Sequence, residues 1–96
     1  MPGLLEGVKV VDLSRYYSGP YCSKLLATLG ADVIKIEPLI TGDPMRSFGP
    51  FASGTANIET GAWFLYLNTS KKSVTLNLKS EEGTNIIKQL VASADI

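Results

Sequence analysis

The sequence contains no histidine and only one cysteine, Cys22, and these absences exclude several kinds of site within it. Without histidine there can be no Ser–His or Cys–His nucleophilic pair and no His-ligated zinc. A single thiol can form neither an internal disulfide nor a thiolate metal cage, and we expect no metal site. Any acid–base groups in these 96 residues must therefore be carboxylates, lysines or tyrosines.

An excess of charge of one sign is also lacking, because nine basic residues balance nine acidic ones. We therefore expect neither nucleic acid nor a membrane surface as a partner, and any anion site must be local. The longest apolar runs have about five residues, far short of the ~20 that cross a membrane. The N-terminus lacks the basic and long apolar regions of a signal peptide. These features predict a soluble, cytoplasmic protein.

Residues 7 to 37 form the most regular stretch, and their pattern predicts strand, loop, helix and strand. A β-branched run ends at Asp12, and Pro20 suits a first helical position because its φ is fixed and its missing N–H costs nothing there. Gly30 is expected to end the helix, and a second strand closes at Pro38. One apolar helical stripe is expected to be buried: Cys22, Leu25, Leu26 and Leu29.

The rest of the chain predicts a long loop over residues 38–61, rich in glycine and proline, and then three further elements. Trp63–Leu67 is expected to be a short helix, and an alternating pattern predicts a strand over 74–79. Ser80 is expected to cap a helix over 80–94, and Asp95–Ile96 to begin another strand. The buried stripe predicted for the last helix is Ile86, Ile87, Leu90, Val91 and Ala94.

The order β-α-β-loop-β-α is half of a doubly wound, mainly parallel sheet, so we predict an α/β, Rossmann-like fold. Because the last helix otherwise leads to no strand, we interpret the chain as a fragment, incomplete at its C-terminus, rather than a complete small domain. The first loop lacks the Gly-x-Gly-x-x-Gly pattern that lets a backbone approach pyrophosphate. A nicotinamide site is therefore not predicted.

A series of short motifs runs through the whole chain: Asp12–Arg15, Ser18–Cys22, Leu29–Glu37, Gly42–Asp43, Arg46, Asn68, Lys71–Ser80, Glu82–Gly83 and Ala94–Asp95. In this order and spacing they resemble the family III CoA-transferases, which include formyl-CoA transferase and crotonobetainyl-CoA:carnitine CoA-transferase. The α-methylacyl-CoA racemases are related to them. Members of that family are several times longer, so the resemblance implies that residues 1–96 are the N-terminal portion of a large CoA-binding domain.

The resemblance implies an enzyme that moves CoA between carboxylic acids, with an acyl-CoA and a carboxylic acid as substrates. In the family an aspartate attacks the acyl-CoA, and an aspartyl-CoA thioester follows. That aspartate is expected downstream of residue 96, so we expect no catalytic residue in this chain and no activity from it alone. The full-length protein is expected to be an interlocked homodimer. The alternatives are an acyl-CoA racemase of the same superfamily and a non-catalytic binding fragment.

Two segments supply the predicted CoA-binding residues. The loop before the first helix lies where doubly wound folds bind ligands, and it resembles the family segment that lines the thioester, so Tyr17 and Ser18 are candidates there. The alternative is that its tyrosines only pack. The other segment matches the family residues that flank the CoA nucleotide: Leu76, Asn77, Leu78 and Lys79. Leu76 would pack on adenine and Lys79 would meet a phosphate, unless Lys79 is merely solvated. Weaker candidates are Arg15, Tyr16, Arg46, Lys71 and Lys72.

This chain departs from formyl-CoA transferases at two positions. They have a glutamine where Tyr17 stands, and an arginine that meets CoA where this chain has Pro38, which offers neither charge nor N–H. The resemblance therefore argues against that particular activity. None of the early carboxylates is expected to be the nucleophile: Asp12, Asp32, Glu37 and Asp43. Asp43 is expected to hold a turn through its own backbone, and Cys22 to be a buried structural thiol.

Overall fold

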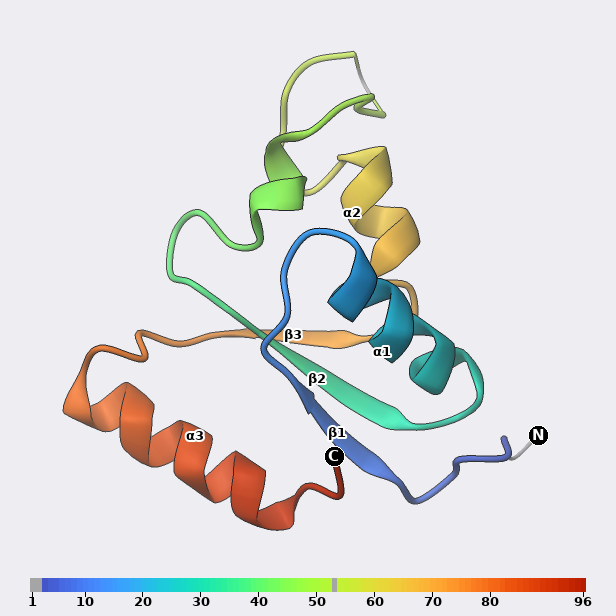
Figure 1. Ribbon diagram of the computed structural model, residues 1–96. Coiled ribbons are helices and arrows are strands. Elements are labelled where there is room, and N and C mark those ends of the chain that lie inside the picture. Colours follow the sequence, from blue (N-terminus) through green and yellow to red (C-terminus); the bar gives the residue numbers. More distant parts are fainter. Residues whose placement is uncertain (1–2, 53) are drawn as a thin grey trace.

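The computed structural model describes residues 3–52 and 54–96. Its centre is a parallel sheet of three strands, in which β2 (Asp32–Glu37) lies between β1 (Lys9–Asp12) and β3 (Lys72–Thr75). Helix α1 (Ser18–Thr28) joins β1 to β2, and α3 (Glu81–Ser93) follows β3. Figure 1 shows these two helices on opposite sides of the strands. The α/β fold with a parallel sheet, predicted from the sequence, is confirmed.

Helix α1 buries a face of small residues, and this differs from the prediction. Its buried residues are Pro20, Ser23 and Ala27, which face the sheet, whereas Cys22, Leu25 and Leu29 are exposed and Leu26 is only partly buried. Small side chains let the helix approach β1 closely enough for Ser23 Oγ to donate a hydrogen bond to Asp12 Oδ2 at 2.6 Å. The expected leucine stripe and the buried thiol are therefore wrong.

The ends of α1 follow from its sequence with one shift. The helix begins at Ser18, so Pro20 is its third residue instead of its first, and a missing N–H is still harmless there because the first-turn N–H groups have no partner within the helix. Gly30 follows the C-cap at φ +107°, a left-handed conformation that glycine adopts without strain. A small apolar cluster then packs between helix and sheet: Val10, Ala27, Ala31 and Val33.

The segment between β2 and β3 forms a second packed unit. It contains a 3₁₀ turn, η1 (Pro44–Ser47), and the short helix α2 (Ala62–Leu67), which was predicted at Trp63–Leu67 and has Asn68 as its C-cap. Met45 from η1 packs with Phe64 and Leu67 from α2 in a separate buried cluster. Figure 1 shows this unit rising beyond the ends of the strands, next to α1.

Strand β3 lies earlier in the chain than the alternating pattern predicted. It covers Lys72–Thr75, and the predicted strand residues 76–79 form a loop and turn instead. The reason is the neighbouring strand: Thr75 pairs with Glu37, the last residue of β2, and the next residue is Pro38, which has no N–H for a further ladder bond. Because β3 is exposed on both faces, the alternation of polar and apolar residues did not indicate which residues form the strand.

Helix α3 begins as predicted but buries less than predicted. Ser80 Oγ accepts a hydrogen bond from Gly83 N–H at 3.0 Å, and Glu81 and Glu82 lie in the first turn. The predicted buried stripe is wrong, because Ile86 and Val91 are exposed and Ile87, Leu90 and Ala94 are only partly covered. The helix contacts the sheet only through β1, which is too narrow a surface to cover the whole stripe.

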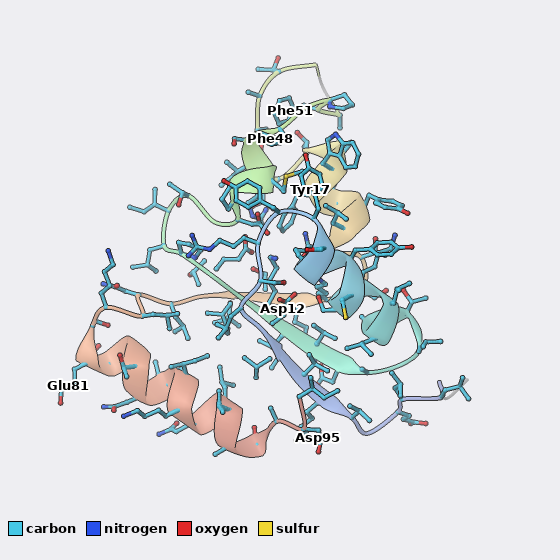
Figure 2. The ribbon with its side chains drawn as sticks, viewed as in Figure 1. Asp12, Tyr17, Phe48, Phe51, Glu81 and Asp95 are labelled. Atoms are coloured by element: carbon cyan, nitrogen blue, oxygen red, sulfur yellow. The ribbon has the colours of Figure 1, made fainter. Side chains whose placement is uncertain are left out.

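The last residues of the chain hydrogen-bond along the free edge of β1, but they do not form the strand that was predicted to begin at Asp95–Ile96. The N–H groups of Asp95 and Ile96 donate to the Lys9 carbonyl at 2.8 and 3.2 Å, and Val11 N–H donates to the Ile96 carbonyl at 3.0 Å. Figure 2 shows Asp95 beside this strand. None of the helices in the described part of the chain has the length and apolar character that a membrane span requires.

Candidate functional site

A cleft of about 420 Å³ opens where the parallel strands end, the position at which open α/β sheets bind their ligands. Three chain segments meet there: the loop after β1, the end of β2 with the residues that follow it, and the turn after β3. The residues that line it are Leu13, Arg15, Ile36, Glu37, Pro38, Leu39, Leu76, Asn77, Leu78 and Lys79. The structure thus brings Arg15 together with all four predicted residues of the second segment.

Two cations and several exposed leucines give the cleft its chemistry. Neither Arg15 nor Lys79 forms an ion pair with any residue that the structure describes, so both can meet an external anion. Glu37 also lines the cleft, but Arg46 neutralises its buried carboxylate at 2.7 Å. Leu39 and Leu78 are 48% and 44% exposed and offer apolar walls. The arrangement suits a ligand that has both an apolar part and anionic groups.

The turn that carries Leu76–Lys79 is fixed by its own hydrogen bonds. Leu76 N–H donates to the Glu37 carbonyl at 3.1 Å, and Asn77 Oδ1 accepts from Lys79 N–H at 3.1 Å. The Asn77 carbonyl accepts from the N–H and hydroxyl of Ser80, which also caps α3. Gly83 lies against this turn so closely that a Cβ there would come within 2.0 Å of the Asn77 carbonyl oxygen. The cleft wall and the start of α3 are therefore one rigid piece.

Tyr17 and Ser18 lie outside the cleft, at the start of α1. The Tyr17 ring packs edge-on against Trp63 of α2, with 5.7 Å between ring centroids, and is 49% exposed. Figure 2 shows Tyr17 between α1 and the α2 unit. Trp63 in turn lines a second, apolar hollow with Pro50, Ala62 and Tyr66. The structure therefore separates the two predicted groups of binding residues, since Arg15 is the only binding residue predicted in the first loop that lines the cleft.

Three weaker candidates have partners inside the protein. Arg46 donates two hydrogen bonds to the Glu37 carboxylate, at 2.7 and 2.8 Å, and its guanidinium lies 3.7 Å from the centre of the Phe64 ring. The Lys71 side chain is buried, and its Nζ lies 3.0 Å from Asp12 Oδ2. Lys72 is exposed at the other end of the strands, 3.3 Å from Asp32. None of these three lines the cleft.

The carboxylates of Asp12 and Glu37 are held in their charged form. Burial alone would raise the pKa of Asp12, but hydrogen bonds from Ser14, Ser23 and Lys71 outweigh it and lower the pKa below its usual value. Burial would likewise raise the pKa of Glu37, but hydrogen bonds from Arg46, the Ser73 hydroxyl and the Asp43 N–H outweigh this effect and lower the pKa to about 2. Burial lowers the pKa of Lys71, and Asp12 only partly offsets this. Within residues 3–52 and 54–96, no three Cys, Asp or Glu side chains gather closely enough to hold a metal ion.

Sequence reasoning missed the residues that build the floor of the site. Leu13, Leu39 and Glu37 line the cleft without having been proposed as binding residues, and the buried pair Lys35–Asp43, with 2.8 Å between Nζ and Oδ2, contacts the backbone of the loop after β1. One signal was available, because Lys35 and Glu37 place charges among the apolar residues Val33, Ile34 and Ile36 of β2. Asp43 does hold its turn, as predicted, by accepting Met45 N–H at 2.9 Å.

Comparison with known proteins agrees with this architecture. The chain is 46% identical over 93 residues to the (R)-2-hydroxy-4-methylpentanoate CoA-transferase of Clostridioides difficile, covering 97% of this chain and 23% of that enzyme. It is 42% identical over 92 residues to the human succinyl-CoA:glutarate CoA-transferase, covering 96% of this chain and 20% of that enzyme. The chain therefore spans about a fifth to a quarter of the length of these relatives.

A solved structure shows the same fold. The crystal structure of a CAIB/BAIF family protein from Brucella suis superposes with a TM-score of 0.86 at 39% sequence identity, and the match covers 99% of this chain and 25% of that protein. The sequence profile of CoA-transferase family III matches residues 5–96, which is nearly the whole chain. The chain therefore belongs to CoA-transferase family III.

Proposed function

We propose that this chain supplies part of the CoA-binding site of an enzyme that transfers CoA from an acyl-CoA to a carboxylic acid. The observation that carries the proposal is the cleft at the carboxyl ends of the strands, with two unpaired cations between apolar walls. CoA has the matching chemistry, because it combines an adenine ring with several phosphates. The similar curated proteins are themselves named as CoA-transferases, which favours transfer over racemisation.

Each part of the cleft has a role in this proposal. Leu76 and Leu78 would pack on the adenine ring, and Lys79 would meet a phosphate as a point charge. Arg15, from the loop after β1, would pair with a second phosphate through its planar guanidinium. Tyr17 and Ser18 would lie further along the ligand, near the free N–H groups at the start of α1, where an acyl thioester oxygen can be bound.

The proposed transfer uses an aspartate from outside these 96 residues. Its carboxylate attacks the acyl thioester, which releases the CoA thiolate and forms a mixed anhydride. The thiolate then attacks the aspartyl carbonyl, which forms the aspartyl-CoA thioester and releases the first acid. A second carboxylic acid takes over CoA by the reverse steps. We propose that the enzyme works as a homodimer and that the 96 residues alone catalyse no transfer.

CoA binding tests the site directly. Isothermal titration calorimetry of the natural gene product with CoA should show binding that weakens about fivefold to tenfold in Arg15→Ala and in Lys79→Ala, since a tenfold change is about 1.4 kcal/mol. Lys88→Ala is the matched control, because Lys88 is an exposed lysine on α3 that does not line the cleft. Equal affinities in all three variants would contradict the assignment of the cleft.

Transfer is tested on the same gene product. The intact mass of the gene product is measured first. A mass well above 10.3 kDa would show that the protein has further residues, among which the proposed aspartate can lie, whereas a mass of 10.3 kDa would favour a binding fragment. Incubation with an acyl-CoA and a panel of carboxylic acids, followed by mass spectrometry, should then show a new acyl-CoA. Formation of aspartyl-CoA by the 96 residues alone would overturn the proposed place of the nucleophile.

A further inference from the structure

Buried charged side chains form hydrogen bonds with the backbone of the loop between β1 and α1. Asp12 Oδ1 accepts the N–H of Ser14 at 2.8 Å, and Lys35 Nζ donates to the Ser14 carbonyl at 3.0 Å. Asp43 Oδ1 accepts the N–H of Tyr16 at 3.4 Å. Both sides of the Ser14 backbone and the N–H of Tyr16 are therefore fixed by side chains that come from other elements.

Lys35 and Asp43 form the innermost of these contacts. Their side chains are 1% and 0% exposed, and their charged atoms lie 2.8 Å apart. A buried ion pair is weak as a stabilising device, because desolvation of the two charges offsets their attraction. Two apolar side chains of similar size would fill the same space. They would not, however, donate to the Ser14 carbonyl or accept from Tyr16.

The conformation that these contacts maintain is an unfavourable one. Tyr16 has φ +69°, a left-handed conformation that a bulky side chain seldom adopts and that costs energy unless its surroundings enforce it. The neighbours of Tyr16 then diverge: Arg15 lines the cleft, while Tyr17 packs on Trp63. If the Tyr16 backbone relaxed to a negative φ, the directions of the Arg15 and Tyr17 side chains would both change.

We propose that Lys35 and Asp43 are positioning residues that hold the Ser14–Tyr16 backbone in the conformation that places Arg15 in the cleft. Neither residue lines the cleft. The inference rests on the proposed function for its ligand, CoA, but the loop conformation is a property of the protein alone. It can therefore be tested without CoA as well as with it.

The first measurement follows the loop without ligand. Amide hydrogen exchange of the natural gene product, read by NMR, should be about tenfold faster at Tyr16 in Lys35→Met than in the wild-type protein, while core amides of α1 keep their protection. Val33→Ala is the matched control, because Val33 lies on the same strand, is equally buried at 1% exposure and packs against α1. This control should lower the melting temperature and leave Tyr16 exchange within about twofold.

The second measurement separates positioning from folding. Lys35→Met alone leaves Asp43 buried without its cation, whereas Lys35→Met combined with Asp43→Asn removes both charges and keeps an acceptor for Tyr16. The double variant should recover most of the melting temperature that the single variant loses. Its dissociation constant for CoA should nevertheless stay raised about tenfold, since Ser14 still lacks its donor. Val33→Ala should bind CoA within about twofold of wild type.

The outcomes distinguish the two proposals. Wild-type CoA affinity in the double variant, or an equal loss in Val33→Ala, would overturn the positioning role and leave the pair as part of the fold only. Absence of CoA binding by the wild-type protein would overturn the proposed function instead. In that case the exchange rate of the Tyr16 amide still decides whether the buried pair holds the loop.

Discussion

Protonation of the buried Glu37 carboxylate should destabilise the folded protein in acid by a measurable amount. Its carboxylate is 2% exposed, and the hydrogen bonds from Arg46, Ser73 and Asp43 outweigh burial and lower its pKa from 4.5 to about 2. At about 1.4 kcal/mol for each pKa unit, this difference amounts to about 3 kcal/mol of folding free energy. For a domain of this size that is a large share of the total, which is commonly about 5–15 kcal/mol.

The sign of the effect follows from the direction of the change. Because the pKa of Glu37 is lower in the folded protein than in the unfolded chain, the stabilisation is fully present above about pH 5 and is lost as the pH falls towards 2. The lowered pKa of Asp12 adds in the same direction. We therefore expect the free energy of unfolding, measured with urea at a series of pH values, to fall by about 3 kcal/mol or more over this range.

A double variant isolates the contribution of Glu37. Glu37→Gln combined with Arg46→Met removes both charges, so that no buried guanidinium is left unpaired. Its free energy of unfolding should depend less on pH than that of the wild type, by about 3 kcal/mol between pH 5 and pH 2. Glu59→Gln is the control, because Glu59 also faces Arg46, at 3.8 Å, but is 74% exposed and should keep the wild-type dependence. An undiminished acid loss in the double variant would refute the assignment to Glu37.

Three further substitutions or probes test the packing. Lys71→Met should destabilise the fold by about 3 kcal/mol or more, because it leaves the buried carboxylate of Asp12 without its cation. Lys72→Met, at an exposed ion pair, should change the free energy of unfolding by less than about 0.5 kcal/mol. Equal urea midpoints for the two variants would contradict this. Gly83→Ala should cost about 1–3 kcal/mol in urea unfolding, since the new Cβ meets the Asn77 carbonyl oxygen, and a neutral result would mean that the turn gives way easily. Cys22, which is exposed, should react with a thiol reagent in the native protein without denaturant; labelling that needs denaturant would show it buried.

The strand–helix–strand unit could be predicted because each of its signals is local. A β-branched run, a proline near the helix start and a glycine after it depend only on neighbouring residues, and the structure has all three elements. The buried face of α1 could not be predicted, because hydrophobicity alone favours Leu25 over Ser23. Close approach of helix to strand selects small side chains instead, and the hydrogen bond from Ser23 to Asp12 makes a polar residue suitable for the interior.

The candidate site was only partly predictable for the same reason. Residues 76–79 and Arg15 are found in one cleft, and family motifs had pointed to both segments. The buried ion pairs join residues from separate segments of the chain, such as Asp12 with Lys71, and no local sequence pattern indicates such a pairing. The register of β3 depended on where Pro38 ends its partner strand. The end of β3 is therefore set by its pairing with β2, and the alternation of polar and apolar residues along β3 does not indicate it.

The long segment between β2 and β3 has a consequence for the order in which the fold forms. The contact between Ser23 and Asp12 closes a loop of 11 residues, whereas the contact between Lys71 and Asp12 closes one of 59. The longer closure costs about 1.5 kcal/mol more in chain entropy. The unit of β1, α1 and β2 should therefore assemble before β3 docks. Mutations within that early unit should slow refolding, while those at Lys71 should mainly speed unfolding.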